Sequence, residues 1–254
     1  MGAKTQKKDG LACKERDDET FHELEVASPV VIVQAGHVGR TKGKTGTEGT
    51  YYTPIPGQKK KKQRHYLSEK QLADAVANLI KRHLDSVKTR RMRVLRYDAD
   101  NVPNFKNRAI EFPVAVVAIH CNGSENKSDS GYCFGFPASH DKVTELKDTI
   151  AAAYEEVQGS HWVGTRRIAH EGKDNYTAGL RSYYVWRKMP TTAPCCLVET
   201  GYLTHAEECR VIDENKPFIA YAIALGVVRF LKAEMTLFFP ELSKLEEPRP
   251  QSPG

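Results

Sequence analysis

Two histidines stand at equivalent places in the chain, each shortly after a run of apolar residues. His37 follows the β-branched run Val30–Val33, and His120 directly follows Val114–Ile119. Such runs are typical of strands buried in a parallel sheet, and open α/β sheets place their ligand sites at the carboxyl ends of these strands. One histidine at a strand end is as often a hydrogen-bonded core residue. Two in the same position are expected to converge at one edge of the sheet.

A carboxylate stands in the same position of a third apolar run, because Glu199 directly follows Cys195–Val198. Burying an acidic group at the end of a strand is costly unless the group has a partner or a role. Beside a metal-activated water, a glutamate can act first as general base and then as general acid to a leaving amine. An ion pair with an arginine such as Arg181 would also explain the position, and the sequence leaves both interpretations open.

A second glutamate, Glu69, is expected in the first turn of a helix. Ser68 and Gln71 form a capping box, which sets the helix start. Apolar residues then recur at helical spacing, at Leu72, Ala75, Val76, Leu79, Ile80 and Leu84. A carboxylate in a first turn commonly offsets the positive end of the helix dipole. Glu69 can also join the histidines, because two imidazoles and one carboxylate are a common ligand set for catalytic zinc that leaves a fourth position for water.

The elements that must position these residues alternate between strands and amphipathic helices. Strands are expected at Val30–Val33, Met92–Tyr97, Val114–Ile119, Tyr132–Phe136 and Cys195–Val198. Helices are expected at Glu69–Val87, Asp141–Val157 and Phe218–Thr236. This alternation favours a mostly parallel sheet covered on both faces. We therefore predict an α/β fold with a single domain, in which a mostly parallel twisted sheet has helices on both faces.

Polar segments set the expected boundaries of this domain. Residues 1–27 are rich in Lys, Asp and Glu, which predicts a flexible N-terminal arm. Residues 39–66, which include the basic run Lys59–Arg64, are expected to form a long basic loop. The proline-containing residues 241–254 predict a disordered C-terminal tail. The predicted catalytic domain therefore spans residues 28–240.

Composition limits the class of protein. The chain has 254 residues, of which 40% are hydrophobic, and a formal net charge of +6, which favours anionic partners. Its six cysteines have no regular spacing, and the pair Cys195 and Cys196 lies in an apolar run, so reduced, buried thiols are expected. The apolar residues 218–239 include Arg229, Lys232 and Glu234, which predicts a packed amphipathic helix rather than a transmembrane segment.

Together the four pieces resemble the zinc-dependent N-acetylmuramoyl-L-alanine amidase family, in its amidase-3 branch. The matching pieces, in the family's order, are Gly36-His37, Glu69-Lys70, Ile119-His120-Cys121-Asn122 and Leu197-Val198-Glu199-Thr200-Gly201-Tyr202. The similarity extends over residues 29 to 233. It implies that His37, Glu69 and His120 bind Zn²⁺ and that Glu199 is the catalytic carboxylate. It also implies hydrolysis of the amide bond between N-acetylmuramic acid and L-alanine in peptidoglycan, which degrades the cell wall.

The spacing from His37 to Glu69 is longer than is usual in the family, as though the lysine-rich segment were inserted. Glu48 lies closer to the usual spacing and is the rival third ligand. Glu69 is preferred because the pair Glu69-Lys70 and the apolar stripe after it match the family's helix, whereas Glu48 lies among Gly and Thr residues.

Other features of the sequence resemble bacteriophage members of the family. These are the variant Gln34-Ala35-Gly36-His37 and the stretch Gly43–Gly49, which imply a bacteriolytic endolysin. No apolar segment follows the N-terminal lysines, so no signal peptide is visible. We therefore expect the protein in the host cytoplasm, with release to the cell wall by a separate route.

The expected partner is peptidoglycan, and the basic run Lys59–Arg64 could also attract anionic wall polymers or be only a solvated loop. Nucleic acid is not an expected partner. Aromatic residues before the Glu199 strand, including Tyr183 and Trp186, suit a sugar–peptide groove or core packing. Two other functions fit parts of the pattern. One is a zinc carboxypeptidase or amidohydrolase acting on small acyl-amino acids, and the other is a non-catalytic wall or nucleic-acid binding protein.

Overall fold

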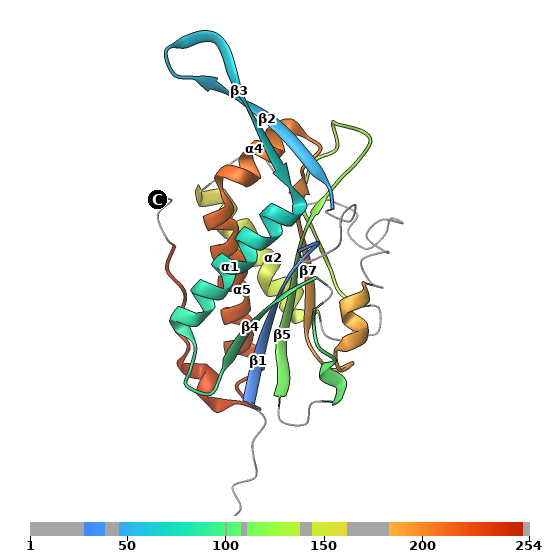
Figure 1. Cartoon of the computed structure of the whole chain (residues 1–254). Coiled ribbons are helices and arrows are strands. Elements are labelled where there is room, and N and C mark those ends of the chain that lie inside the picture. The colour runs from blue at the N-terminus through green and yellow to red at the C-terminus, as the bar shows by residue number, and fades with distance from the viewer. Residues whose placement is uncertain are drawn as a thin grey trace, which may run out of the picture.

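A computed structural model describes residues 28–38, 46–99, 101–107, 111–137, 144–161 and 183–250 (Figure 1). The expected N-terminal arm (residues 1–27), Cys13 and Arg181 lie outside these residues. So do residues 39–45 of the expected basic loop and the last four residues of the expected tail.

The core of the fold is a five-stranded sheet with the strand order β4-β1-β5-β7-β6. Its strands are β1 (Ser28–Ala35), β4 (Arg93–Asp98), β5 (Glu111–Asn122), β6 (Cys133–Gly135) and β7 (Cys195–Tyr202). All neighbouring pairs are parallel except β6 with β7, which is antiparallel. The carboxyl ends of β1, β5 and β7 therefore lie at the same edge, and the predicted mostly parallel sheet is confirmed.

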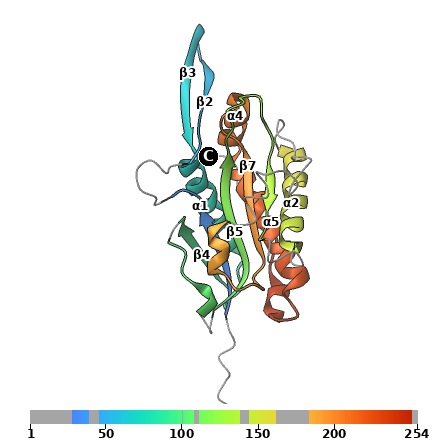
Figure 2. The ribbon, with the colours of Figure 1, turned by 90° about the vertical axis from the view of Figure 1, so that its right-hand side faces the viewer.

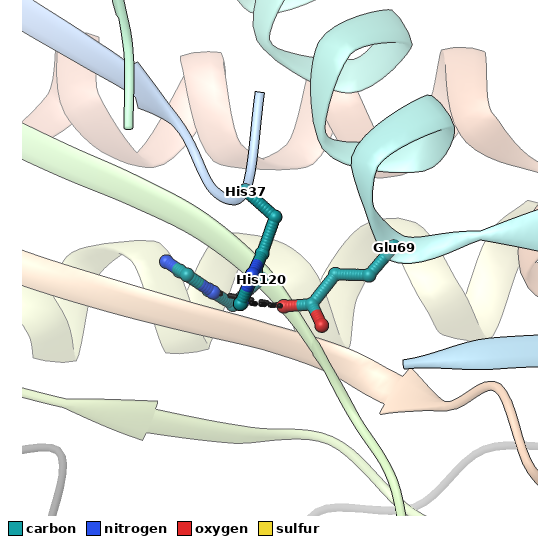
Figure 3. Close-up of side chains that lie close together, drawn as sticks. All are labelled: His37, Glu69 and His120. Carbon is teal, nitrogen blue, oxygen red and sulfur yellow. Dashed lines mark hydrogen bonds and ion pairs between the residues drawn. The ribbon is translucent and has the colours of Figure 1, made fainter. Parts of the chain in front are cut away.

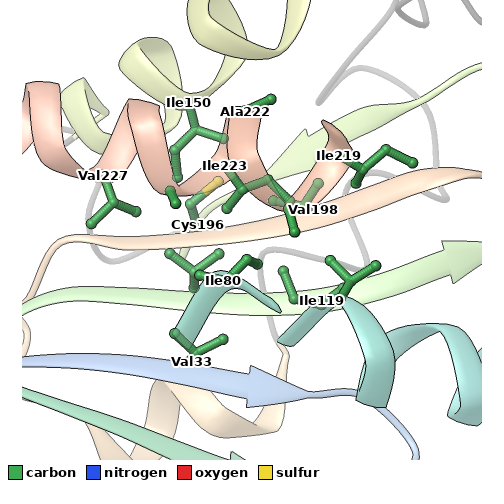
Figure 4. Close-up of a cluster of buried hydrophobic side chains, with 14 of the residues drawn as sticks. Val33, Ile80, Ile119, Ile150, Cys196, Val198, Ile219, Ala222, Ile223 and Val227 are labelled. Atoms are coloured by element: carbon green, nitrogen blue, oxygen red, sulfur yellow. The ribbon is translucent and has the colours of Figure 1, made fainter. Parts of the chain in front are cut away.

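Side chains of β1 alternate between two separate apolar clusters. Val31 and Val33 belong to the large cluster, and Val30 and Ile32 belong to the small one. The large cluster packs the sheet against the long helices α1 (Glu69–Val87), α2 (Glu145–His161) and α5 (Lys216–Glu234), as Figures 2 and 4 show. Among the described residues, the 3-10 helices η1 (Phe105–Asn107) and η3 (Tyr184–Lys188) cover the other face. The single-domain α/β fold is thus confirmed, with its long helices on one face.

The prediction of a long loop over residues 39–66 is wrong from residue 48 onward. Residues Glu48–Ile55 (β2) and Gln58–Ser68 (β3) pair as an antiparallel hairpin that extends away from the domain (Figure 1). Pro56 and Gly57 form its turn, and Gly57 has a φ of +74°, as the third position of a type II turn requires. The dipeptide Pro-Gly directly after the aromatic and β-branched residues of Tyr51–Ile55 is the hairpin signal that the following lysine run obscured.

The C-terminal segment is also more ordered than predicted. Residues Pro240–Lys244 form the 3-10 helix η4, and Leu242 and Leu245 are buried in the large cluster. Arg229 of α5 donates to the Glu247 carboxylate at 3.0 Å. A disordered tail is therefore wrong for residues 241–250, because two leucines and an ion pair attach this segment to α5.

Two further predictions concern burial. The five described cysteines are buried thiols, as expected: Cys121, Cys133, Cys195, Cys196 and Cys209. The apolar C-terminal helix α5 packs within the large cluster. In the part of the chain that the structure describes, no helix has both the length and the apolar character needed to cross a bilayer. A short helix that the sequence did not predict, α4 (Ala206–Glu214), follows β7 and contacts β2.

Candidate active site

His37 reaches the site through an unusual backbone conformation at the end of β1. Its φ is +58°, the left-handed region that residues other than glycine seldom adopt. The residue before it, Gly36, donates from its backbone N–H to the Ile119 carbonyl at 2.9 Å. A Cβ on Gly36 would lie 2.5 Å from His120 Cε1, so only glycine lets β1 pass this close to the second histidine. The Gly-His pair thus brings the two imidazoles together.

Glu69 and the two histidines converge on one point (Figure 3). Glu69 Oε1 lies 2.8 Å from His120 Nδ1 and 3.4 Å from His37 Nε2. Glu69 is 3% exposed and His120 is buried, whereas the His37 side chain is 21% exposed. Each of the three residues offers one atom that could ligate a metal ion, and these three atoms lie within 4.8 Å of one another. The arrangement that the sequence predicted for His37, Glu69 and His120 is therefore present.

Local structure fixes the Glu69 side chain. Ser68 caps α1 with the capping box that the sequence predicted: its Oγ accepts from the Gln71 N–H at 3.3 Å, and its own N–H donates to Gln71 Oε1 at 3.0 Å. Glu69 is consequently the first residue of the helix, but its carboxylate points to the histidines rather than to solvent. The backbone N–H groups of Thr47 and Cys121 donate to it at 2.9 and 3.1 Å.

Gly46 lets the chain approach this carboxylate from the other side. Its φ is +80°, and a Cβ there would lie 2.3 Å from Glu69 Oε2. The next residue, Thr47, also accepts the Glu69 backbone N–H at 2.8 Å. Glu69 is thus enclosed by the chain on either side of the hairpin, and its position depends on residues that lie directly before β2 and directly after β3.

The surroundings of Glu69 favour its ionised form. Burial raises the pKa of the carboxyl, but the hydrogen bond from His120, the charges of His120 and His37 and the Thr47 N–H outweigh burial, and the pKa is lowered overall. An ionised carboxylate only accepts hydrogen bonds, so it takes the Nδ1–H of His120 in this arrangement. The carboxylate is therefore available as an anionic metal ligand at neutral pH.

Behind His120 lies a second, polar layer. His120 Nε2 is 2.8 Å from the Tyr183 hydroxyl, and Gln34 Nε2 donates to the same hydroxyl at 3.2 Å. Because Nδ1 faces Glu69 and His37, it is the His120 atom that faces the possible metal position. Binding a metal through Nδ1 requires the imidazole proton on Nε2, where the Tyr183 oxygen can accept it.

Glu199 lies beside His120, on the neighbouring strand of the sheet. It is paired with His120 in the register of β5 and β7, and it is buried. A cavity of about 260 Å³ is lined by the three clustered residues together with Glu199, Gly46, Thr47, Cys121 and Gly123. The structure thus places the expected catalytic carboxylate in the wall of the same cavity.

Glu48 lies apart from this cluster. It is exposed at the base of the hairpin, where it pairs with Ser68 and accepts a hydrogen bond from the Tyr66 hydroxyl. It lines a separate cavity of about 480 Å³, together with Lys127 and His205. Of the two rival glutamates, only Glu69 reaches the histidines, as the helix pattern predicted.

The sequence did not predict the contacts that three further residues make in the site. Gln34 is fully buried inside an apolar strand, and a polar residue in such a run is a signal that could have been used. Tyr183 was only one of several aromatic residues before β7. Thr47 acts through its backbone, which leaves no mark in the sequence.

Comparison with known proteins decides the family. A family model described as N-acetylmuramoyl-L-alanine amidase (amidase-3) matches residues 31–229. This chain belongs to that family. The match includes the cluster, Glu199, the hairpin and most of α5. No curated protein sequence matches the chain.

Solved structures of other amidases share the fold of this family member. An N-acetylmuramoyl-L-alanine amidase from Clostridium difficile 630 has a TM-score of 0.54 and 21% identity, over 82% of this chain and 99% of that one. AmiC2 of Nostoc punctiforme has a TM-score of 0.52 and 22% identity, over 81% of this chain and 97% of that one. The catalytic domain of CwlV from Bacillus (Paenibacillus) polymyxa has a TM-score of 0.52 and 20% identity, over 82% and 99%. At these identities the likeness concerns the fold.

Proposed function

We propose that this amidase-family protein is a zinc enzyme that hydrolyses the amide bond between the lactyl group of N-acetylmuramic acid and L-alanine in peptidoglycan. The observation that carries the proposal is the convergence of His37, Glu69 and His120 in a cavity that Glu199 also lines. Membership of the amidase family supports the reaction class.

The donor set fits zinc. Catalytic zinc sites commonly have three protein ligands drawn from histidine and acidic residues, with an open position for water or substrate. His37, Glu69 and His120 would hold the ion, and Glu69 would be its anionic ligand. When bound, zinc supplies Lewis acidity, which polarises the substrate carbonyl and lowers the pKa of a water molecule.

Glu199 is suited to transfer the proton of this reaction. Its carboxylate would accept a proton from the attacking water and deliver it to the nitrogen of L-alanine as the C–N bond breaks. The strand pairing of β7 with β5 fixes its backbone beside His120. Burial restricts the access of bulk water to this carboxylate, which helps it to return the proton to the leaving amine.

Tyr183 and the backbone around Glu69 would position the ligands. The Tyr183 hydroxyl determines which nitrogen of His120 is free for the ion, since it contacts Nε2. The N–H groups of Thr47 and Cys121 fix the Glu69 carboxylate. Prior fixation of this kind reduces the reorganisation needed when substrate binds.

The test is hydrolysis of purified cell walls by the full-length protein, followed by mass analysis of the products. New L-alanine amino termini with intact glycan chains are expected. A chelator should abolish the formation of these amino termini until zinc is added back. Release that persists unchanged in His37→Ala would overturn the proposal. Release of single carboxyl-terminal residues instead would indicate a zinc carboxypeptidase.

We further propose that the enzyme is a bacteriophage endolysin that acts from the host cytoplasm. The resemblance of Gln34-Ala35-Gly36-His37 to phage members supports this. Cells that express the protein are expected to lyse only when a membrane-permeabilising protein or agent is supplied. Lysis without permeabilisation would contradict this route of release.

A further inference from the structure

The β2–β3 hairpin exposes a group of cations for which the structure describes no acidic partners. Lys60, Lys61, Lys62 and Arg64 of β3 are all exposed. Within the part of the chain that the structure describes, no carboxylate lies at ion-pair distance from any of these four residues. Arg210 and Arg229, in contrast, each contact two glutamates. The positive charge of the hairpin is therefore not neutralised by any carboxylate that the structure describes.

The two faces of the hairpin have different roles. Tyr51 is buried, stacks on His65 at 4.7 Å between ring centroids, and donates its hydroxyl to Asp213. This face attaches the hairpin to the α4 region of the domain. Successive strand residues point to opposite faces, so the neighbouring Tyr52 and Arg64, which are directly paired, lie on the other face.

That other face combines aromatic and cationic side chains with one carboxylate at its base, Glu48, which accepts a hydrogen bond from the Tyr66 hydroxyl. Tyr52 is 54% exposed and Tyr66 is 51% exposed, although both are large aromatic residues. Lys62, Arg64 and Tyr66 alternate along β3 on the same face, about 7 Å apart from one to the next. We call Tyr52, Lys62, Arg64 and Tyr66 the basic face. Lys60 lies nearer the turn, where the strand pairing is irregular, and adds exposed charge beside this face.

The hairpin rises directly from the wall of the catalytic cavity. Its last strand pair joins Glu48 to Ser68, and the next residues on either side are Thr47 and Glu69. These two are linked by hydrogen bonds in both directions, at 2.8 and 2.9 Å. A polymer bound along the basic face would therefore be kept beside the cavity, which suits a polymer carried by the same material as the substrate.

We propose that the basic face binds a phosphodiester polymer attached to the bacterial cell wall and thereby keeps the cavity on the wall. The cations would contact successive phosphates, with release of counterions, and Tyr52 and Tyr66 would pack against the sugar or polyol units between them. That the polymer is a wall component rests on the proposed function, because the cavity is proposed to cut peptidoglycan. The binding itself does not depend on catalysis.

Binding can be measured with the full-length Glu199→Gln protein, so that the walls are not digested. The probes are purified Gram-positive walls that carry their phosphodiester polymer, and the same walls after hydrofluoric acid has removed it. The test variant adds Lys60→Gln, Lys62→Gln and Arg64→Gln. A matched control adds Lys232→Gln, Lys244→Gln and Arg249→Gln, which removes the same charge from exposed cations of the C-terminal part of the chain.

We expect removal of the polymer to weaken binding by roughly tenfold or more at low salt, and the hairpin variant to show the same loss on untreated walls. The slope of log affinity against log salt should fall by about 2 in the hairpin variant, since three phosphate contacts are lost. The control variant should bind like the parent. A hairpin variant with Lys60→Arg and Lys62→Arg, which keeps the charge, should also bind like the parent.

Three results would overturn this proposal. They are equal binding to walls with and without the polymer, equal losses in the hairpin and control variants, and displacement by duplex DNA at lower phosphate concentration than by the free wall polymer. The last would identify the face as a nucleic-acid site. Amide cleavage by the protein with intact Glu199 is measured separately on the stripped walls. Failure of that cleavage overturns the proposed function, whereas failure of polymer binding alone overturns only this inference.

Discussion

The base and the tip of the β2–β3 hairpin belong to one stretch of chain but have opposite physical character. At the base, Glu69 is buried and three polar groups surround its carboxylate: His120, Thr47 N–H and Cys121 N–H. Toward the tip, the cations are exposed and have no described acidic partner. Burial with complete hydrogen bonding fixes a ligand in place for chemistry, whereas exposure leaves charge available to an external polymer. The difference explains how one segment can extend the surface of the protein while its two ends still build the cavity.

The largest effect should come from replacing one of the two buried glutamates that line the cavity. Glu69→Gln removes the anionic ligand and should lower both zinc content and wall hydrolysis, the latter by about 10³-fold or more. Glu199→Gln should lower hydrolysis by about 10²- to 10⁴-fold but leave zinc content unchanged, because it removes only the proton carrier. Metal analysis and product release on the same samples separate the two.

Glu48→Gln is the matched control at the exposed base of the hairpin. It should retain both zinc and activity, because Glu48 does not reach the histidines. Loss of zinc in this variant would contradict the assignment of Glu69 as the third ligand.

Glu208, a buried carboxylate outside the cluster, should show how burial shifts a carboxyl pKa when no cation offsets the shift. Glu208 accepts hydrogen bonds from the Gly131 and Tyr202 N–H groups, and burial raises its pKa from 4.5 to about 7 despite these bonds. The folded chain thus binds this proton more tightly than the unfolded chain. The resulting stabilisation is fully present below about pH 4.5 and is lost as the pH rises through 7, a fall of about 3 kcal/mol in the free energy of unfolding.

Glu208→Gln should remove this part of the pH dependence. Denaturant unfolding of both proteins at several values between pH 4.5 and 8 measures it. Parallel curves for the wild type and the variant would show that Glu208 does not titrate in this range.

Two glycines with similar φ values, one before the base of the hairpin and one in its turn, allow these two regions to be compared. Gly46 and Gly57 have φ values of +80° and +74°, but a Cβ on Gly57 meets nothing within 4 Å, whereas on Gly46 it meets Glu69. Each alanine substitution should cost about 1–2 kcal/mol in stability from the left-handed backbone. Only Gly46→Ala should also weaken zinc binding, by about 10- to 100-fold, because it displaces Glu69. Equal zinc affinities in the two variants, by competition with a chelator, would contradict this account of the base.

The smallest effect is expected from Tyr183→Phe, which removes one hydroxyl behind His120. The variant keeps the ring but cannot accept the His120 Nε2 proton, so zinc affinity should fall by about tenfold. Chelator competition and the zinc concentration needed for half-maximal activity both report this change. Unchanged zinc affinity would assign Tyr183 to core packing alone.

The sequence predicted the strand-end residues well for a physical reason. His37 follows β1, and His120 and Glu199 lie in the carboxyl-terminal parts of β5 and β7. Parallel strands bring such positions to one edge whatever the loops do. The capping box likewise determined where Glu69 begins its helix. These local rules depend on burial and hydrogen bonding close in sequence. The choice of Glu69 over Glu48 came instead from the resemblance of Glu69-Lys70 and the apolar stripe after it to the family's helix.

The hairpin and the second layer of the site could not be predicted in the same way. The lysines of β3 indicated a solvated loop, because they outnumber the strand-forming residues around them. The contacts of Gly46 and Thr47 with Glu69 depend on the hairpin bringing its two ends together, which spacing alone does not reveal. The contact of Tyr183 with His120 joins residues 63 positions apart, and no local pattern encodes it.

The central claim is that His37, Glu69 and His120 together hold one zinc ion on which amide cleavage depends. The most direct measurement is the zinc content of the purified full-length protein, determined beside its rate of L-alanine amino-terminus release from cell walls. The account predicts about one zinc per chain, and loss of both zinc and cleavage in Glu69→Gln. Full cleavage by a zinc-free protein, or undiminished zinc in Glu69→Gln, would contradict it.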